Sequence, residues 1–264
     1  MQTFRNLRER VESLPSRNPE ISQAFFYKEI PSTNLDTMSR GRLAAPAGTL
    51  IVADSQSKGR GRLDRKWESP LGKGLYFSLL LRPDMKAAGA PLINLAVGLG
   101  IAKVLREAGV GKSMVKWPND VTVEKKKLAG VLTEMVTKKD KVDFVVVGVG
   151  VNVLSDAQDF SPETAALATS LKQIEAKAWD RGEILENLVP AILHEVKQLV
   201  ANGAPALISR WEKESGMVGE RIRAKLQDRE VEGEVTGLAA DGQLKIKTAG
   251  GETLQLLAED ATLI

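Results

Sequence analysis

Short apolar runs separated by turn residues recur through residues 25–152 and predict a sheet of several strands. The runs 49–53 (TLIVA) and 74–81 (GLYFSLLL) are almost wholly apolar, which is typical of strands buried on both faces. Residues 128–136 and 141–149 flank a polar turn and predict a hairpin of two long strands. The run 25–30 (FFYKEI) predicts one more strand, which a proline closes.

Helical spacing of apolar residues predicts helices around these strands. Residues 91–108 form a strongly apolar helix with a proline in its first turn, and we expect it to pack against the sheet as scaffold. A helix is also expected over residues 1–14, ended by Pro15. Its apolar face comprises Phe4, Leu7, Val11 and Leu14. The later helices are expected at 164–171, 182–200 and 205–215.

The texture of the sequence changes at Gly216, where short strand patterns replace helical ones. Asp241-Gly242 and Gly250-Gly251 predict hairpin turns between these strands. The pattern suits a small SH3-like barrel. We therefore expect two domains, a catalytic domain over 1–215 and a C-terminal domain over 216–264, with Trp211-Glu212 packed at their junction. The predicted strands are 219–226, 230–238, 243–248 and 252–257.

Composition narrows the class of protein. With 264 residues and 43% hydrophobic content the chain can bury a large core. It contains no cysteine, which excludes disulfides, thiolate metal sites and a cysteine nucleophile. The one histidine, His194, lies in a predicted helix and is expected to be structural, so a Ser-His-Asp or histidine-metal mechanism is not expected. No apolar run approaches the roughly 18 residues that a membrane span needs, so we expect a cytoplasmic protein without a membrane partner.

Positive charge is concentrated in one segment. The chain has 37 basic and 34 acidic residues, yet residues 58–66 (KGRGRLDRK) hold five positive charges and one negative, Asp64. Glycine backbones approach phosphates closely, and arginine forks bind phosphate or carboxylate in two places. A solvated surface loop and a nucleic-acid patch are alternative interpretations. The position of the segment between two buried strands favours a loop that binds an anionic ligand.

The segment resembles the GRGRxGRxW loop of biotin protein ligases, and further motifs of that family follow in order. This chain has Asp64 where the family usually has glycine; Asp tolerates a left-handed backbone better than most residues, at some cost. The other motifs are Ser32-Thr33-Asn34, Gln56, Lys116-Trp117-Pro118-Asn119-Asp120, Lys127-Leu128-Ala129-Gly130 and Gly148-Val149-Gly150-Val151-Asn152.

The resemblance implies an α+β fold with a mixed, mainly antiparallel sheet and flanking helices, the class II synthetase-like biotin/lipoate ligase fold, plus a C-terminal SH3-like β-barrel. It also implies a reaction in two steps. Biotin reacts with Mg-ATP to give biotinyl-5′-AMP, and a lysine of a biotin carboxyl carrier protein then takes the biotin. The chain resembles the single-function type that lacks an N-terminal DNA-binding domain, so no DNA partner is expected. Dimerisation through a sheet edge stays open.

The resemblance also implies which residues act. The catalytic set is Lys127, Asp120 and Arg62, with Asp120 as the candidate ligand of Mg²⁺. The biotin set is Ser32, Thr33, Asn34, Gln56, Arg60, Arg62, Lys127 and Gly130. The adenylate set is Arg60, Arg62, Arg65, Trp67, Asn119, Lys127 and Asn152, with residues 153–161 as an adenine cover.

The same residues have ordinary structural interpretations. Thr33 with Asp36 resembles a helix cap, Pro118-Asn119-Asp120 a turn, and Lys125-Lys126-Lys127 a solvated turn. The glycines of 148–150 indicate a bulge or the close approach of another backbone. Two functional alternatives also remain: a lipoate or octanoate ligase of the same superfamily, and a nucleic-acid-binding module.

Overall fold

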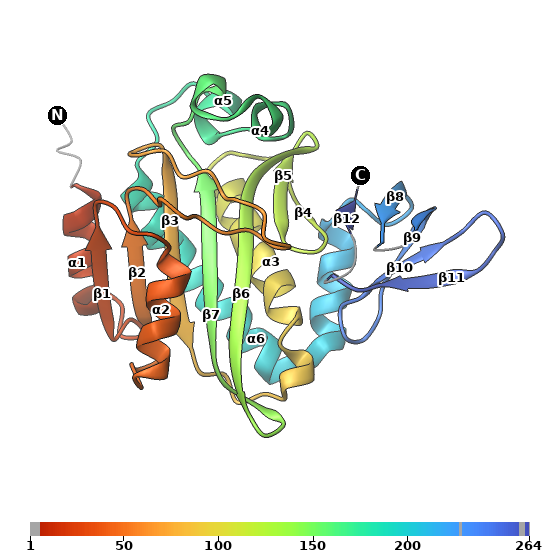
Figure 1. Cartoon of the computed structure of the whole chain (residues 1–264), viewed down its shortest axis with the longest axis horizontal. Helices are drawn as coiled ribbons and strands as arrows, with labels where there is room; N and C mark the ends of the chain where they lie inside the picture. The colour runs from red at the N-terminus through yellow and green to blue at the C-terminus, as the bar shows by residue number, and fades with distance from the viewer. Residues whose placement is uncertain (1–5, 227–228, 259–261, 264) are drawn as a thin grey trace.

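The computed structural model describes residues 6–226, 229–258 and 262–263, which form two separate sheets (Figure 1). The larger sheet has seven strands in the order β1-β2-β3-β7-β6-β5-β4. β1 and β2 pair in parallel, and every other neighbouring pair in this sheet is antiparallel. The predicted mixed, mainly antiparallel sheet is therefore confirmed.

The strands of the larger sheet follow the apolar runs closely. β2 and β3 are buried at every residue, and β6 and β7 form the expected long hairpin. The strand expected over 25–30 is wrong at both ends, because the five residues of β2 offer partners only to residues 23–27. The bounds are β1 Gln23–Tyr27, β2 Thr49–Ala53, β3 Gly74–Leu81, β4 Ser113–Lys116, β5 Asp120–Val123, β6 Lys126–Lys138 and β7 Lys141–Asn152.

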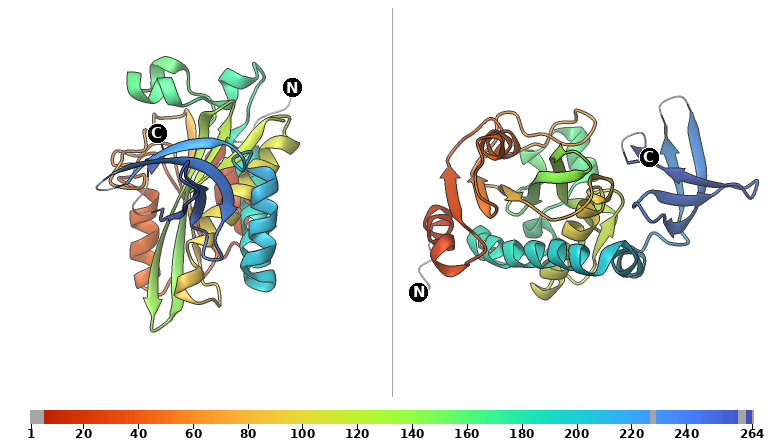
Figure 2. Two further views of the ribbon diagram at one scale, coloured as in Figure 1. Left: turned by 90° about the vertical axis from the view of Figure 1, so that its right-hand side faces the viewer. Right: turned by 90° about the horizontal axis from the view of Figure 1, so that it is seen from below.

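Helices cover the two faces of this sheet unequally. α3 and α6 pack together on one face, and α2 lies on the other against β2, β3 and β7 (Figures 1 and 2). The helices are α1 Leu7–Arg17, α2 Thr33–Arg42, α3 Leu92–Glu107, α4 Pro162–Leu167, α5 Leu171–Ile174 and α6 Arg181–Glu214, with short 3-10 turns at Ala87–Gly89 and Ala157–Asp159.

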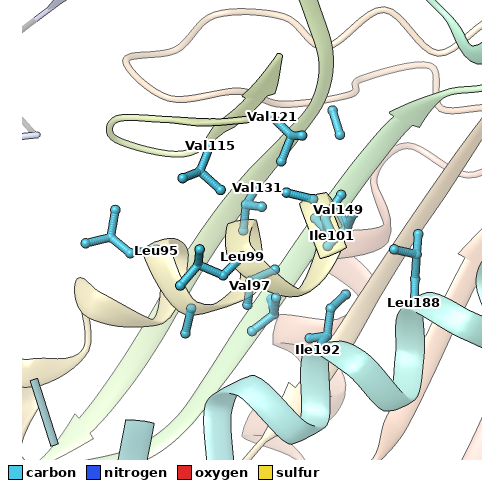
Figure 3. Packing of buried hydrophobic residues seen from close by; sticks show 14 of the residues in the cluster. Leu95, Val97, Leu99, Ile101, Val115, Val121, Val131, Val149, Leu188 and Ile192 are labelled. Atoms are coloured by element: carbon cyan, nitrogen blue, oxygen red, sulfur yellow. The ribbon is translucent and has the colours of Figure 1, made fainter. Parts of the chain in front are cut away.

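The main core lies between the sheet and the α3–α6 layer. Leu99 and Ile101 of α3 pack among valines of the sheet and against Leu188 and Ile192 of α6 (Figure 3). The segment Ala87–Glu107 is long and apolar enough to cross a bilayer, but 72% of its apolar window is buried inside the protein. The segment is therefore the core helix that its sequence predicts.

Two predicted helix ends are wrong. α1 continues through Pro15 to Arg17, because a proline in the last turn removes only one intrahelical hydrogen bond while Leu14 stays buried. The expected helix 164–171 is broken, because Ala168 is extended and pairs with Lys127 of β6. The break expected between helices 182–200 and 205–215 is confirmed, because Gly203 is non-helical (φ 73°) and divides α6 at that point. Phe4 lies outside the described residues.

The second sheet has five strands in the order β11-β10-β9-β8-β12 and lies beside the first (Figure 2). All of its pairs are antiparallel, as in an SH3-like domain. Its strands confirm the four expected ones and add β12. They are β8 Arg221–Lys225, β9 Glu230–Leu238, β10 Leu244–Lys247, β11 Thr253–Leu256 and β12 Thr262–Leu263.

Hydrogen bonds join the second sheet to the rest of the protein. Leu238 donates its backbone N–H to Glu212 Oε1 (3.0 Å), next to the buried Trp211. Trp117 donates its indole N–H to the carbonyl of Gly242 (3.0 Å). The expected packing of Trp211-Glu212 at this junction is confirmed, and Trp117 of the KWPND motif contributes as well.

An ion pair joins the two parts of α6 on either side of the kink at Gly203. Arg210 donates to both oxygens of Glu195 (3.0 and 2.6 Å); the Glu195 side chain is 6% exposed and that of Arg210 is 40% exposed. Arg210→Met strands a buried carboxylate and is expected to cost about 3 kcal/mol. Glu195→Gln leaves an arginine that reaches water and is expected to cost about 1 kcal/mol.

Urea unfolding of the two variants and the parent, followed by tryptophan fluorescence, measures this asymmetry. An equal decrease in the free energy of unfolding in both variants would show that burial of the Glu195 carboxylate does not determine the cost of breaking this ion pair.

Candidate active site

The motifs converge on a cavity of about 200 Å³ above strands β6 and β7. Its wall contains every predicted site residue except Asn152. These lining residues are Ser32, Thr33, Asn34, Gln56, Arg60, Arg62, Arg65, Trp67, Asn119, Asp120, Lys127 and Gly130. Segments far apart in the sequence therefore meet at one place.

The arginine loop is a small hairpin rather than an irregular segment. Gly59 and Trp67 pair through a backbone bond (3.0 Å), and Gly61 N–H donates to the carbonyl of Arg65 (2.7 Å). A Cβ on Gly59 would lie 2.3 Å from the carbonyl oxygen of Trp67, so a larger residue does not fit there. Asp64 adopts the left-handed backbone that was expected of it (φ 55°), and Leu63 does so too. The tip of the loop thus contains two consecutive strained residues.

Glycines of the sheet form the floor of the cavity. A Cβ on Gly148 would lie 1.9 Å from Asn34 Oδ1, and one on Gly150 would lie 2.4 Å from the ring of Trp67. Gly130 lies under the same indole, and a Cβ added to it would be 2.8 Å from the ring. The glycines therefore mark a close approach, as predicted, but side chains approach them instead of another backbone.

The start of α2 presents hydroxyl and amide groups to the cavity. The helix begins after Ser32, whose side chain makes no capping bond, and Asp36 pairs with Arg40 (2.6 Å). The capping interpretation of Thr33 with Asp36 is therefore wrong. Thr33 instead donates from both N–H (2.9 Å) and Oγ1 (3.2 Å) to Gln56 Oε1. Gln56 Nε2 donates in turn to Ser69 Oγ (3.0 Å).

A second polar group lies beside the first. Ser78 Oγ lies 2.6 Å from Asn34 Oδ1 and 2.8 Å from Thr33 Oγ1, beneath both side chains. Asn34 Nδ2 donates to Glu134 Oε2 (3.0 Å), and Arg60 donates to Glu134 Oε1 (3.0 Å). These bonds fix the orientation of the polar groups before a ligand enters.

The other end of the cavity is charged. Lys127 Nζ lies 2.7 Å from Asp120 Oδ1, as an ion pair, and 5.1 Å from the centre of the Trp67 ring. Arg62 donates to Asn119 Oδ1 (3.4 Å), and Asn119 Nδ2 donates to the carbonyl of Val131 (2.5 Å). Lys127 and the arginines thus surround one region with positive charge.

Asn152 is placed differently from the prediction. It is buried, does not line the cavity, and donates from Nδ2 to the carbonyl of Thr169 (3.0 Å). Thr169 donates its own N–H to the carbonyl of Lys127 (2.9 Å). Asn152 therefore supports the segment beside Lys127, and its contact with an adenylate stays a prediction.

The segment 153–161, the predicted adenine cover, is tied to the end of the arginine loop. Glu68 accepts bonds from the N–H and the hydroxyl of Ser161 (2.9 and 2.7 Å) and from the hydroxyl of Thr164 (2.7 Å). Although burial opposes ionisation, these bonds lower the pKa of Glu68 below its ordinary value. Glu68 therefore stays charged and holds the two segments together at neutral pH.

Ser78 and Glu134, which bond to the lining residue Asn34, were missed in the sequence, and Lys116 was quoted in a motif without a role of its own. Ser78 is the single serine in the buried run of β3, and Glu134 is a carboxylate on a largely apolar strand; each exception was a usable signal. Lys116 lines the cavity at the end of β4. Within the basic triplet 125–127, Lys127 lines the cavity and its two neighbours do not.

The arrangement suits a ligand with a neutral polar head and an anionic end. Hydroxyls and amides at one side complement donors and acceptors, and cations at the other neutralise negative charge. Among the described residues, no group of three or more His, Asp or Glu side chains forms a metal site. Asp120 is the carboxylate among the described residues that line the cavity.

Comparison with known proteins matches both parts of the chain. Residues 27–152 match the biotin/lipoate A/B protein ligase family, and residues 218–258 match the biotin protein ligase C-terminal domain. The bifunctional ligase/repressor BirA of Bacillus subtilis is 33% identical, over 88% of this chain and 71% of its own length. The biotin–(acetyl-CoA-carboxylase) ligase of Mycobacterium tuberculosis is 31% identical, over 87% of this chain and 84% of its own.

A solved structure shares the fold as well. The biotin protein ligase of Aquifex aeolicus in complex with biotin and ATP superimposes with a TM-score of 0.75 at 33% identity, over 91% of this chain and 97% of the other. Sequence motifs, both matched regions and the fold agree with the resemblance inferred from the arginine loop. The chain belongs to the biotin protein ligase family.

Proposed function

We propose that this biotin protein ligase joins biotin and ATP in the cavity as biotinyl-5′-AMP, and then transfers biotin to a lysine of a biotin carboxyl carrier protein. The observation that carries the proposal is the pairing, within one cavity, of neutral hydrogen-bonding groups from α2 with the cations of residues 60–66 and Lys127. Such a cavity complements biotin, whose ureido ring is neutral and polar and whose chain ends in a carboxylate.

The neutral side would hold the biotin ring. Ser32, Thr33 and Gln56 offer hydroxyl and amide groups that match the N–H donors and carbonyl acceptor of a ureido ring. Asn34 and Gly130 complete this side, with Val131 and Val149 as apolar wall for the hydrocarbon chain. A binding site of this kind rejects ligands that leave its polar groups unpaired.

The charged side would carry the chemistry. An oxygen of the biotin carboxylate attacks the α-phosphorus of ATP, the bond to the β-phosphate breaks, and pyrophosphate leaves. Arg60, Arg62 and Arg65 would hold the phosphates, with Trp67 and Asn119 beside them. Lys127 would stabilise the charge that develops on the carboxyl and α-phosphate oxygens.

In the second step the lysine amine of the carrier attacks the biotinyl carbonyl carbon. The amide bond forms, the bond to AMP breaks, and the amine loses a proton. Asp120, which pairs with Lys127 at 2.7 Å, would orient that lysine and accept the proton or align the incoming amine. Magnesium in such sites is bound largely by water and substrate phosphates, so one protein carboxylate, Asp120, fits an ion that arrives with ATP and neutralises its charge.

The two alternatives fit the cavity less well. Lipoate and octanoate lack a ureido ring and would leave the polar groups around Thr33 and Gln56 without ligand partners. A nucleic-acid module would be expected to present its arginines to solvent without protein partners, whereas Arg60 and Arg62 line the cavity and bond to Glu134 and Asn119. Biotin is the ligand that uses both sides of the cavity.

The wider setting is also part of the proposal. A mycobacterial relative is named for acetyl-CoA-carboxylase, which supports a carrier domain of a biotin-dependent carboxylase as acceptor. The end of α6 at Glu214 and the start of β8 at Arg221 support a domain division near residues 215 and 216. We further propose a cytoplasmic location, and a homodimer through a sheet edge remains a hypothesis.

Pyrophosphate exchange tests the first step. Purified protein should exchange labelled pyrophosphate into ATP with biotin and not with lipoate or octanoate. Lys127→Ala should lower the rate by about 100-fold or more, because it removes a charge that stabilises the transition state. Lys126→Ala, which changes the exposed neighbour of Lys127, is the matched control and should exchange at the parent rate.

Exchange with lipoate or octanoate in place of biotin would contradict the assignment of biotin as the substrate. Equal rates in Lys127→Ala and the parent would remove Lys127 from the reaction.

The charge of Asp64 generates a further prediction. Asp64→Asn keeps a side chain that tolerates the left-handed backbone but removes a negative charge from the arginine hairpin. We expect release of biotinyl-5′-AMP, measured by rapid filtration, to slow about twofold to fivefold at low salt, with the difference fading near 0.5 M salt as charges are screened. A difference that survives high salt would point to backbone strain instead of charge.

A further inference from the structure

Glu134 holds two parts of the site at once. Its Oε1 accepts from Arg60 of the hairpin, and its Oε2 accepts from Asn34 at the start of α2, each at 3.0 Å. Its side chain is 26% exposed and that of Arg60 is 40% exposed. The carboxylate lies on β6 next to the cavity without lining it, so a role in contacting substrate does not explain it.

Asn34 keeps this carboxylate in place independently of Arg60. The amide is buried, lies against Gly148, and is bonded to Ser78 as well as to Glu134. Glu134 is therefore anchored to the start of α2. Its bond to Arg60 is the exchangeable one, because Arg60 comes from a hairpin whose tip is exposed and strained.

We propose that Glu134 is a positioning residue that latches the arginine hairpin over the cavity through Arg60 before substrate binds, and yields Arg60 to the anionic group of the ligand. A half-exposed carboxylate–arginine pair is weak, about 0.2–1 kcal/mol, so a phosphate or carboxylate can displace it. Glu134 keeps its bond from Asn34 after the exchange and is partly hydrated, so no unpaired buried charge remains. The identity of the anion rests on the proposed function; the latch itself does not.

Limited trypsin digestion without ligands tests the latch directly. Glu134→Gln retains an acceptor for Asn34 but loses the charge that holds Arg60. Cleavage within residues 58–66 should accelerate about twofold to fivefold, because proteolysis follows the population of the open loop. Asp143→Asn, which removes a carboxylate paired with Arg82 on the adjacent strand, is the matched control and should be cleaved at the parent rate.

A second variant breaks the same pair from the other side. Arg60→Gln should accelerate cleavage at the remaining basic residues of the hairpin, and adding Glu134→Gln to it should have no further effect. With biotin and ATP present, the difference between Glu134→Gln and the parent should disappear, because the ligand then holds the hairpin. In kinetics, Glu134→Gln should raise the KM for ATP with little change in kcat.

The outcomes separate the latch from the proposed activity. Cleavage of Glu134→Gln at the parent rate, or equal acceleration in Asp143→Asn, would overturn the latch. So would additive effects of Arg60→Gln and Glu134→Gln. A parent protein that showed no biotin-dependent exchange would contradict the proposed function, while the digestion without ligands would still decide the latch.

Discussion

The site depends on the close approach of two side chains to the backbone of β7. Asn34 and Trp67 occupy the space that a Cβ would take at Gly148 and Gly150. Because these two positions are glycines, α2 and the arginine hairpin can both pack closely against the same face of the sheet. Any larger residue at either glycine would push the start of α2 or the hairpin away, and with it the polar or the charged side of the cavity.

Repulsion between the cations of the site is offset by the partners that several of them have. A hairpin with five cations repels itself, yet it is short and anchored by backbone bonds, with Arg60 paired to Glu134 of β6 and Arg62 to Asn119 of the β4–β5 turn. Lys127 is held between Asp120 and the face of Trp67. Pre-oriented cations of this kind need little rearrangement when negative charge develops on a ligand, which is the physical basis of electrostatic catalysis.

The rest of the fold holds this arrangement rigid. The buried α3–α6 layer packs against β6 and β7 from the opposite face and supports the glycine floor. The KWPND segment links the cavity to the second sheet, because Trp117 bonds to Gly242 while Asn119 and Asp120 line the cavity. The KWPND segment thus connects the C-terminal sheet to the charged side of the site.

Local pattern in the sequence determined much of this protein. Apolar runs located the strands of the central hairpin, a glycine pair marked a close approach, and the basic motif located the loop and the family. Partners distant in the sequence were decided by the tertiary structure: Glu134 meets Arg60 and Asn34, which lie 74 and 100 residues away. The same holds for Ala168, whose pairing with Lys127 ended a helix that local propensity would have continued. Periodicity reports the face on which a residue lies, but a hydrogen bond between elements depends on how the whole sheet is assembled, and only the folded chain contains that information.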